Sequence, residues 1–256
     1  MRNGERLGLM DAVIPAGGEI DAAYQDAAGS RHRALAPIGR SQTPVMQIVV
    51  DALRGSGAVA SIIAVGHPDL QSKIQGVDRW IDAAPSGPEN ILAGLAQAKT
   101  PMALVCTSDL PFLQAQSVAA FAERIPADAD IALGLVDADE FNRAYHDAPP
   151  STFVTLRGMA PATISGLFAT RPKTLIDNSD LLRTAFESRK SQWRSAQLLG
   201  PRLTWRFLTR SLALGAVVQR AEAILGCRAA VLEGSAPDLA FDIDAVEDYQ
   251  YAKTRK

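Results

Sequence analysis

The feature that most constrains the fold is the alternation of short apolar runs with segments of helical periodicity over the first 136 residues. Each apolar run is six to eight residues long, as in strands that are buried on both faces. Strands that alternate with helices form right-handed βαβ units, so we predict a three-layer α/β/α fold with a Rossmann-like, mostly parallel sheet. Thr43 is expected to cap the first helix, with Pro44 as its first residue. The predicted strands cover residues 11–16, 59–65, 102–107 and 129–136, and the predicted helices cover residues 44–53, 89–98 and 114–124.

The alternation stops after these elements, and the second half of the chain has a different pattern. We expect one domain over residues 1–256, with a mixed sheet and a helical insertion at residues 172–226. The predicted elements of this half are short strands at 153–156 and 163–169 around a turn at Arg157–Gly158, helical structure over 174–220 with a break at Pro201, extended segments at 231–233 and 241–244, and a helix over 247–253.

The composition excludes several classes of protein. The chain has 256 residues, 47% of them hydrophobic, and a formal net charge of −2. These values argue against disorder and against binding of nucleic acid through an overall basic surface. No apolar run reaches the ~18 residues of a membrane span, and residues 1–10 lack the apolar core of a secretory signal, so we expect a cytoplasmic protein without a transmembrane segment. Cys106 and Cys227 are too few for a disulfide framework or a cysteine metal site.

Three groups of residues follow predicted strands at the edge of the sheet where ligands of parallel α/β proteins gather. Gly17 and Gly18 come after the first strand, where paired glycines either let backbone amides approach a phosphate group or form a simple turn. Asp109 follows the third strand and either holds a hard cation such as Mg²⁺ or caps the next turn. Alternation places Asp242 and Asp244 on one face of an extended segment. Two carboxylates on one face repel each other, so a bound cation explains them better than a plain surface does.

Taken in order, these motifs resemble the nucleotidyltransferases related to the molybdenum-cofactor guanylyltransferase, which share the sugar-nucleotide transferase fold. The resemblance covers nearly the whole chain. It rests on the strand and glycine loop 12–18; on residues 33–38 with Gly39 and Pro44, which resemble Lys-x-Leu-x-Pro-x-x-Gly-x-Pro; on Ser86, Gly87 and Asn90; on Thr107-Ser-Asp-Leu-Pro111; and on residues 242–248, which resemble Asp-Ile-Asp-Thr-Pro-Glu-Asp.

The resemblance implies a fold of the nucleotide-diphospho-sugar transferase type and a reaction that depends on Mg²⁺ or Mn²⁺. In that reaction a nucleoside monophosphate passes from a nucleoside triphosphate to a phosphorylated or alcohol acceptor, and pyrophosphate is released. Positioning and charge neutralisation would supply most of the acceleration, without a covalent enzyme intermediate. The implied roles are metal binding by Asp109, Asp242 and Asp244, nucleotide binding by Ala16, Gly17, Gly18, Arg33, Ser86, Gly87 and Asn90, and catalysis by Arg33 and Asp109.

The chain departs from the family pattern in the glycine loop and near its end. Glu19, Asp21 and Asp26 follow the glycines, where a triphosphate with about four negative charges tolerates carboxylates only if they turn away. Arg33 stands where many relatives have lysine, and Ala245–Val246 stand where the family has Thr-Pro.

These departures leave alternatives open. The chain is either an active nucleotidyltransferase or a catalytically weakened relative that binds a nucleotide or another phosphorylated ligand for regulation. An enzyme that transfers sugar from a nucleotide-sugar donor would usually carry a second acidic residue two positions after Asp109, where Pro111 stands.

A basic segment between Arg183 and Arg228 is the least expected feature, because it holds nine Lys and Arg residues and only two Glu. It is either a solvated face that packs on the sheet or forms a homodimer contact, or a lid that attracts a phosphorylated or membrane-associated acceptor. In the second case, replacing Arg202, Arg206 and Arg210 with Gln raises the KM of the acceptor alone. The histidines show no zinc-site spacing, and His32 is expected to be an exposed loop residue.

Overall fold

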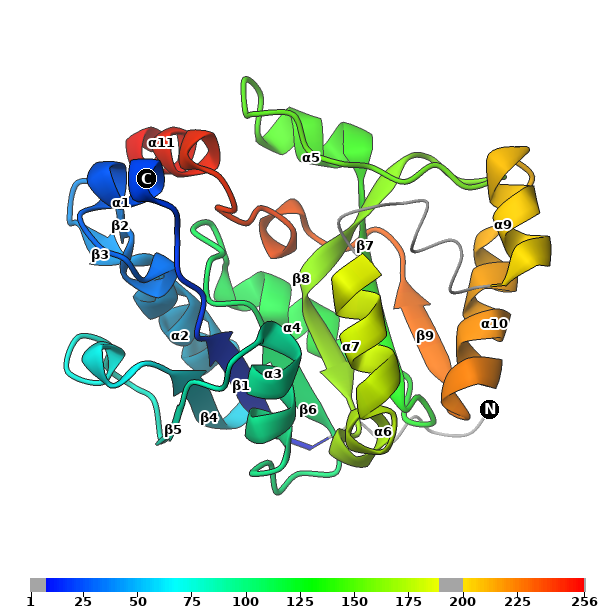
Figure 1. The fold of residues 1–256 in the computed structure, drawn as a ribbon, viewed down its shortest axis with the longest axis horizontal. Helices are drawn as coiled ribbons and strands as arrows, with labels where there is room; N and C mark the ends of the chain where they lie inside the picture. Colours follow the sequence, from blue (N-terminus) through cyan, green and yellow to red (C-terminus); the bar gives the residue numbers. More distant parts are fainter. Residues whose placement is uncertain (1–7, 189–199, 256) are drawn as a thin grey trace.

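A seven-stranded sheet forms the centre of the computed structural model, which describes residues 8–188 and 200–255 (Figure 1). The strands are β1 (Met10–Ala16), β4 (Val59–Gly66), β5 (Arg79–Asp82), β6 (Ala103–Cys106), β7 (Ile131–Asp137), β8 (Ala162–Thr170) and β9 (Ala229–Leu232). Their order across the sheet is β5-β4-β1-β6-β8-β7-β9. β8 runs antiparallel to both β6 and β7, and the other neighbouring pairs are parallel. The mostly parallel, mixed sheet confirms the predicted fold class.

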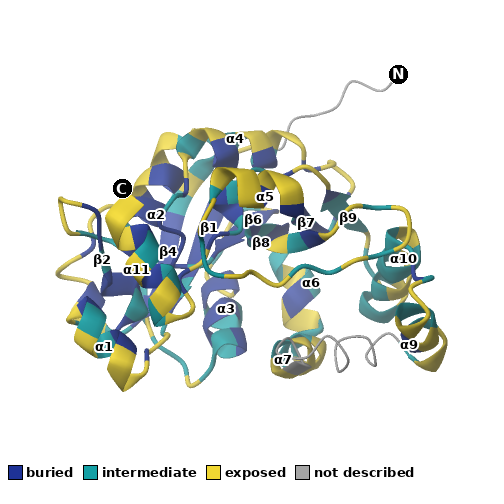
Figure 2. Ribbon diagram, turned by 90° about the horizontal axis from the view of Figure 1, so that it is seen from above, coloured by how far each residue is buried: buried dark blue, intermediate teal, exposed yellow. Residues whose placement is uncertain are grey.

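Helices cover both faces of this sheet (Figure 2). One face carries α2 (Val45–Gly55) and α4 (Ala115–Glu123), and the other carries α3 (Gly87–Leu95), α6 (Pro172–Asp177) and α7 (Ser179–Ser188). The remaining helices are α1 (Ala22–Ala28), α5 (Ala138–Ala144), α9 (Pro201–Leu208), α10 (Leu214–Leu225) and α11 (Val246–Arg255), with 3-10 turns at η1 (Arg33–Leu35), η2 (Pro68–Leu70) and η3 (Pro237–Leu239).

The side chains of β1 alternate between the two apolar cores, one on each face of the sheet. Ile14 packs in the core shared with α2 and α4, whereas Val13 packs with Ile91 and Leu95 of α3. The period of two in a strand requires this division. α3 approaches β1 so closely that a Cβ on Gly94 would lie 2.2 Å from Val13 Cγ1. The mainly apolar strand predicted at this position therefore lies between two helical layers.

The first long helix begins one residue later than predicted, at Val45. Thr43 and Pro44 form the short strand β3 (Thr43–Pro44), which pairs with β2 (Pro37–Ile38). The Thr43 hydroxyl lies 2.8 Å from that of Ser41, and no side-chain cap bond is present at this helix. The prediction of Thr43 as cap is wrong because Pro44 is the N-cap residue and Thr43 lies one position before it, paired in β3.

The second half differs from the prediction in two places. Residues 153–156 form no strand beyond one antiparallel bridge between Val154 and Ala162. The helical structure predicted over 174–220 is divided into separate helices, and Pro201 is the first residue of α9, a position that proline favours. Residues 8–188 and 200–255 contain no helix with the length and apolar character to cross a membrane.

Two buried aspartates accept hydrogen bonds from distant segments of the chain, near the start of β1 and the start of α4. Asp11, in β1, accepts hydrogen bonds from the Ser61 hydroxyl and from the amides of Lys99 and Thr100, at 2.6, 2.6 and 3.1 Å. Burial alone would raise the pKa of Asp11, but these donors outweigh it, and the pKa is lowered. Asp238 accepts from the amide of Gln114, the N-cap of α4, at 2.9 Å. It thereby fixes the start of a helix 124 residues away.

Candidate functional site

The candidate site lies beyond β1 and β6, where the following loops carry polar groups. Arg33 Nη1 donates to Asp109 Oδ2 at 3.0 Å and also contacts Asp244 Oδ1. Asp109 is buried, and its Oδ1 has no hydrogen-bond partner among the described residues. The structure thus places Arg33 between two of the predicted carboxylates, which lie 76 and 211 residues away from it in the chain.

Asp242 and Asp244 are both exposed, while Ile243 between them is fully buried. This confirms the alternation expected from the sequence, although the segment has no regular strand pairing. The Ile243 amide donates to the Asp109 carbonyl oxygen at 3.2 Å, and the Tyr24 hydroxyl donates to the Ile243 carbonyl oxygen at 3.1 Å. These bonds hold the Asp242–Asp244 segment against the loop that carries Asp109.

The site has an excess of negative charge, because three carboxylates surround one guanidinium. Reduced hydration of the Asp242 carboxyl group and the neighbouring charges of Asp109 and Asp244 raise the pKa of Asp242 above its usual value. Burial of Arg33 opposes its charge, but Asp109 and Asp244 outweigh that effect and raise its pKa. A group of oxygen donors with excess negative charge is the kind of site that hard divalent cations occupy.

The glycine loop follows Ala16, the last residue of β1, and it lies against Asn90 of α3. A Cβ on Gly17 would lie 2.5 Å from Asn90 Nδ2, whereas nothing lies within 4 Å of a Cβ on Gly18. Asn90 is buried, and its Oδ1 accepts from the Ala84 amide at 2.7 Å. Gly17 is therefore required by packing, while the surface of Gly18 stays open for a ligand.

Ser86 and Gly87 form the start of α3, beside the same loop. Ser86 is the N-cap, and its hydroxyl accepts from the Glu89 amide at 3.5 Å. A Cβ on Gly87 would lie 2.6 Å from Cε1 of Phe186 in α7. A helix of the segment predicted as an insertion therefore packs over the start of α3.

The acidic residues after the glycine loop turn toward other partners. Asp21 caps α1 by accepting from the Tyr24 amide at 2.9 Å. Glu19 lies 3.8 Å from His67 Nε2 and 4.0 Å from Arg31 Nε, and Asp26 is exposed on α1. Asp21 therefore caps a helix, and Glu19 lies beside basic and imidazole side chains.

The expectation that His32 is an exposed loop residue is wrong, because only 3% of it is exposed. Its ring lies 4.6 Å from the ring of His67, centroid to centroid. The two histidines are far apart in the chain, so no spacing motif reveals them. A usable signal is that His67 follows β4 and Glu19 follows β1, which are neighbouring parallel strands that end at the same edge.

The basic segment is partly neutralised by acidic partners. Arg183 pairs with Glu89 of α3 at 2.8 Å and with Asp180 at 2.7 Å, and Arg228 pairs with Asp128 at 2.6 Å. Arg202, Arg206 and Arg210 belong to α9 and the turn after it, whereas Arg189, Lys190 and Arg194 lie outside the described residues. Some of the positive charges in this segment are therefore paired with carboxylates. The ion pair of Arg183 with Glu89 also holds α7 against α3.

Comparison with known families agrees with this arrangement. The family of MobA-like NTP transferase domains matches residues 12–178, about two thirds of the chain. The chain belongs to this family. The part of this chain that matches the family begins in β1 and ends after β8. It includes the glycine loop, Arg33, Asn90 and Asp109. The resemblance to nucleotidyltransferases noted from the motifs is confirmed.

Solved structures show the same fold along nearly the whole chain. A hypothetical transferase from Thermus thermophilus has a TM-score of 0.82 and 24% identity, and the match covers 94% of this chain and 99% of that one. A nucleotidyl transferase from Methanothermobacter thermautotrophicus has a TM-score of 0.55 and 18% identity, with 96% of each chain covered. The 2-C-methyl-D-erythritol 4-phosphate cytidylyltransferase from Thermus thermophilus has a TM-score of 0.54 and 17% identity, covering 96% of this chain and 97% of that one. The comparison with curated proteins gave no match.

Proposed function

We propose that this protein is a Mg²⁺-dependent nucleotidyltransferase that transfers a nucleoside monophosphate from a nucleoside triphosphate to a phosphorylated or alcohol acceptor. The observation that carries the proposal is the convergence of Arg33 with Asp109, Asp242 and Asp244 at the carboxyl ends of β1 and β6, in a chain of the MobA-like family. Ligands of open α/β sheets gather at this edge.

The carboxylates fit a hard divalent cation. Asp109 Oδ1 is buried without a hydrogen-bond partner among the described residues, and such an oxygen is costly unless a ligand contacts it. Asp109, Asp242 and Asp244 would hold Mg²⁺ or Mn²⁺, which when bound supplies positive charge that neutralises the triphosphate and polarises its phosphoryl oxygens.

Arg33 and the glycine loop would hold the phosphate groups. The guanidinium group has five N–H donors, and in this structure Nη1 serves both carboxylates while the buried Nε has no partner in the described part of the chain. The guanidinium donors that the two carboxylates leave unused suit phosphate oxygens, which arginine binds in a bidentate fork. The Arg33 amide also donates to the Gly18 carbonyl oxygen at 3.4 Å, which connects the backbone of Arg33 to the glycine loop.

The nucleoside would lie against the start of α3. Asn90 is a buried polar side chain at this place, and Ser86 and Gly87 form the backbone beside it. Fixed hydrogen-bonding groups of this kind position a ligand with little reorganisation, which is the main contribution a protein makes to phosphoryl transfer.

The reaction itself needs no nucleophile from the protein. An acceptor oxygen attacks the α-phosphorus, the bond from that phosphorus to the bridging oxygen breaks, and pyrophosphate leaves with the electron pair. A phosphate acceptor has no proton to lose at the attacking oxygen, whereas an alcohol acceptor releases its proton to solvent. Arg33 stabilises the charge that develops on the transferred group.

The test is pyrophosphate release with each of the four ribonucleoside triphosphates and Mg²⁺ over a panel of acceptors, together with calorimetric binding of the triphosphates. We expect release with at least one pair of substrates, and we expect Asp109→Asn to lose metal-dependent binding. Asp26→Asn, an exposed acidic residue on α1, serves as the matched control. Binding without turnover over the whole panel would favour the regulatory alternative. Equal triphosphate binding by Asp109→Asn and by the metal-free protein would refute the site.

A further inference from the structure

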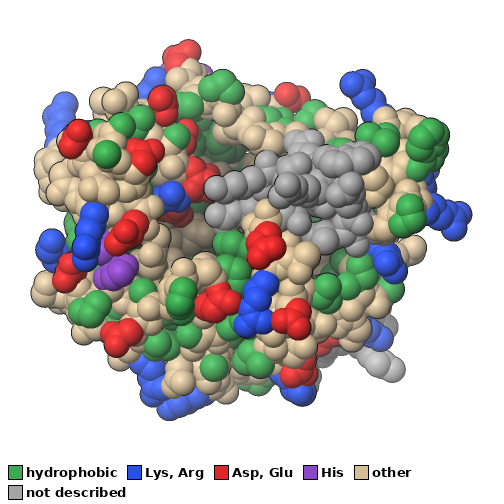
Figure 3. Space-filling view, viewed as in Figure 1, with side chains coloured by type: hydrophobic (Ala, Val, Ile, Leu, Met, Phe, Trp, Pro, Cys, Tyr) green, Lys and Arg blue, Asp and Glu red, His purple; other side chains and the backbone are tan. Residues whose placement is uncertain are grey.

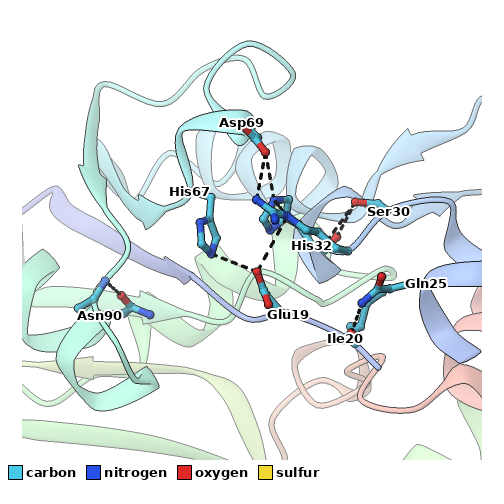
Figure 4. Close-up of polar contacts among 10 residues, drawn as sticks. Glu19, Ile20, Gln25, Ser30, His32, His67, Asp69 and Asn90 are labelled. Carbon is cyan, nitrogen blue, oxygen red and sulfur yellow. Dashed lines mark hydrogen bonds and ion pairs between the residues drawn. The ribbon is translucent and has the colours of Figure 1, made fainter. Parts of the chain in front are cut away.

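Glu19, His32 and His67 form a second group of metal-binding side chains beside the glycine loop. Each offers one ligand atom, and these atoms all lie within 4.8 Å of one another. Figure 4 shows the three side chains approaching one another from separate segments, with Asp69 above His32. In the space-filling view, a histidine side chain lies among acidic and basic side chains at the left of the face shown (Figure 3). This set differs from the carboxylates at Asp109, because imidazole nitrogen predominates in it.

The backbone holds these three residues in place. Glu19 and His32 pair in an antiparallel bridge, supported by the Ile20 amide, which donates to the Arg31 carbonyl oxygen at 3.1 Å. His67 is the N-cap residue of η2, and its carbonyl oxygen accepts from the Leu70 amide at 3.0 Å. A metal site whose ligands lie on fixed backbone loses little conformational entropy on binding.

His32 is the buried member of the group. Its Nε2 lies 3.4 Å from Asp69 Oδ2, while its Nδ1 is buried and has no hydrogen-bond partner in the described part of the chain. Asp69 and Arg31 thus both approach Nε2, which leaves Nδ1 as the ring nitrogen without a protein partner in the described part of the chain.

Arg31 is the opposing charge near this group. Its Nε donates to His32 Nε2 at 3.1 Å, and its guanidinium lies 3.5 Å from Asp69 Oδ2. Arg31 Nε also lies 4.0 Å from Glu19 Oε1, so a bound cation displaces Arg31 from His32 and Glu19, and its 57% exposed side chain can then turn toward Asp69 and solvent. Ligand atoms in a tetrahedral zinc site lie about 3.3 Å apart for bonds of about 2 Å. His67 Nε2 and Glu19 Oε1 are already 3.8 Å apart.

We propose that Glu19, His32 and His67 bind a transition-metal ion of the Zn²⁺ type, with a solvent molecule as the fourth ligand. The ion joins the glycine loop, the segment before Arg33 and the loop after β4. It also gives Glu19 a role that agrees with its position in a phosphate-binding loop, because the ion neutralises this carboxylate. The metal site stands independently of the proposed transferase activity, whereas an effect of the ion on triphosphate binding rests on that activity.

The test is Zn²⁺ binding to the chelator-stripped full-length protein, measured by calorimetry and by the visible absorption of a Co²⁺ derivative. We expect about one Zn²⁺ per chain, tetrahedral Co²⁺ bands and a higher melting temperature with Zn²⁺. His67→Ala should weaken binding roughly 100-fold and abolish the thermal shift, and Glu19→Gln should weaken it roughly 10-fold. His146→Ala is the matched control, because His146 is exposed and pairs with Asp147.

Three results would overturn the proposal. One is a Kd for Zn²⁺ weaker than roughly 10 µM in the unaltered protein. Another is unchanged Zn²⁺ affinity in His67→Ala, which keeps both other ligands. The third is loss of Zn²⁺ binding in Asp109→Asn, because the ion would then occupy the carboxylate site. Retention of Zn²⁺ binding by Asp109→Asn, together with loss of its triphosphate binding, would support both sites separately.

Discussion

The two glycines after β1 allow a sharp test, because they are adjacent in the chain and differ in their surroundings. In Gly17→Ala the new methyl carbon would lie 2.5 Å from Asn90 Nδ2 and 3.3 Å from Ala83 Cβ. The Asn90 amide cannot move away freely, since the side chain is buried and bonded to the Ala84 amide at 2.7 Å. In Gly18→Ala the methyl group meets nothing within 4 Å.

The expected loss of stability in Gly17→Ala follows from these contacts. Forcing an extra methyl group into a packed site costs about 1–3 kcal/mol. Displacement of Asn90 also weakens its hydrogen bond, which contributes about 1 kcal/mol. We therefore expect the free energy of unfolding to fall by roughly 2–4 kcal/mol in Gly17→Ala and to stay within about 0.5 kcal/mol in Gly18→Ala.

Urea denaturation followed by circular dichroism measures both variants. Combining Gly17→Ala with Asn90→Ala completes a double-mutant cycle, and we expect the pair to be more stable than the sum of the single changes by about 1 kcal/mol or more. Equal stability of the two glycine variants, or additivity in the cycle, would refute the packing argument. If the proposed function is right, Gly18→Ala weakens triphosphate binding in calorimetry without this loss of stability.

Further predictions concern charged groups. The pKa of Asp11 is lowered by folding, so its stabilising contribution is present above its unfolded pKa and is lost as the pH falls through the folded value. Asp11→Asn should cost about 1–3 kcal/mol at neutral pH and flatten the fall in stability below about pH 4, which acid titration of unfolding measures against Asp26→Asn. Asp238→Ala should cost about 1–3 kcal/mol in urea denaturation, because the Gln114 amide at the start of α4 loses its acceptor, and an unchanged midpoint would contradict this. Arg33→Lys should weaken triphosphate binding roughly 10-fold in calorimetry, since an ammonium lacks the guanidinium fork. Equal triphosphate affinity of Arg33→Lys and the unaltered protein would show that the guanidinium does not bind the phosphate groups in a bidentate manner.

Much of the fold was predictable because its strands are nearly continuous apolar runs. β1, β4, β6 and β7 all lie where such runs occur, since they are buried within the sheet. β5 was missed because it is a four-residue edge strand with charged residues at both ends, Arg79 and Asp82. The antiparallel direction of β8 depends on pairing with distant strands, and apolar periodicity carries no information about direction.

For the site too, the sequence predicts what depends on local patterns and misses what depends on contacts between distant segments. Sequence placed Asp109 and the glycine loop at one edge, because the carboxyl ends of neighbouring parallel strands meet there. The position of Arg33 between Asp109 and Asp244 depends on tertiary contacts that no local pattern encodes. The contact between His32 and His67 likewise joins two loops through packing, so it became visible only in the structure.

The position of β8 has a consequence for how the chain is made. The strands β5, β4, β1 and β6 are complete once residue 106 has been synthesised, whereas β7 cannot join them until β8 exists. A chain that stops before residue 162 leaves the edges of β6 and β7 with unpaired amide and carbonyl groups, which pair readily with other chains. During translation, β5, β4, β1 and β6 are therefore available first, and β7 and β9 come later. The antiparallel strand β8 joins the two groups. Interruption between them would leave an aggregation-prone fragment in place of a smaller working domain.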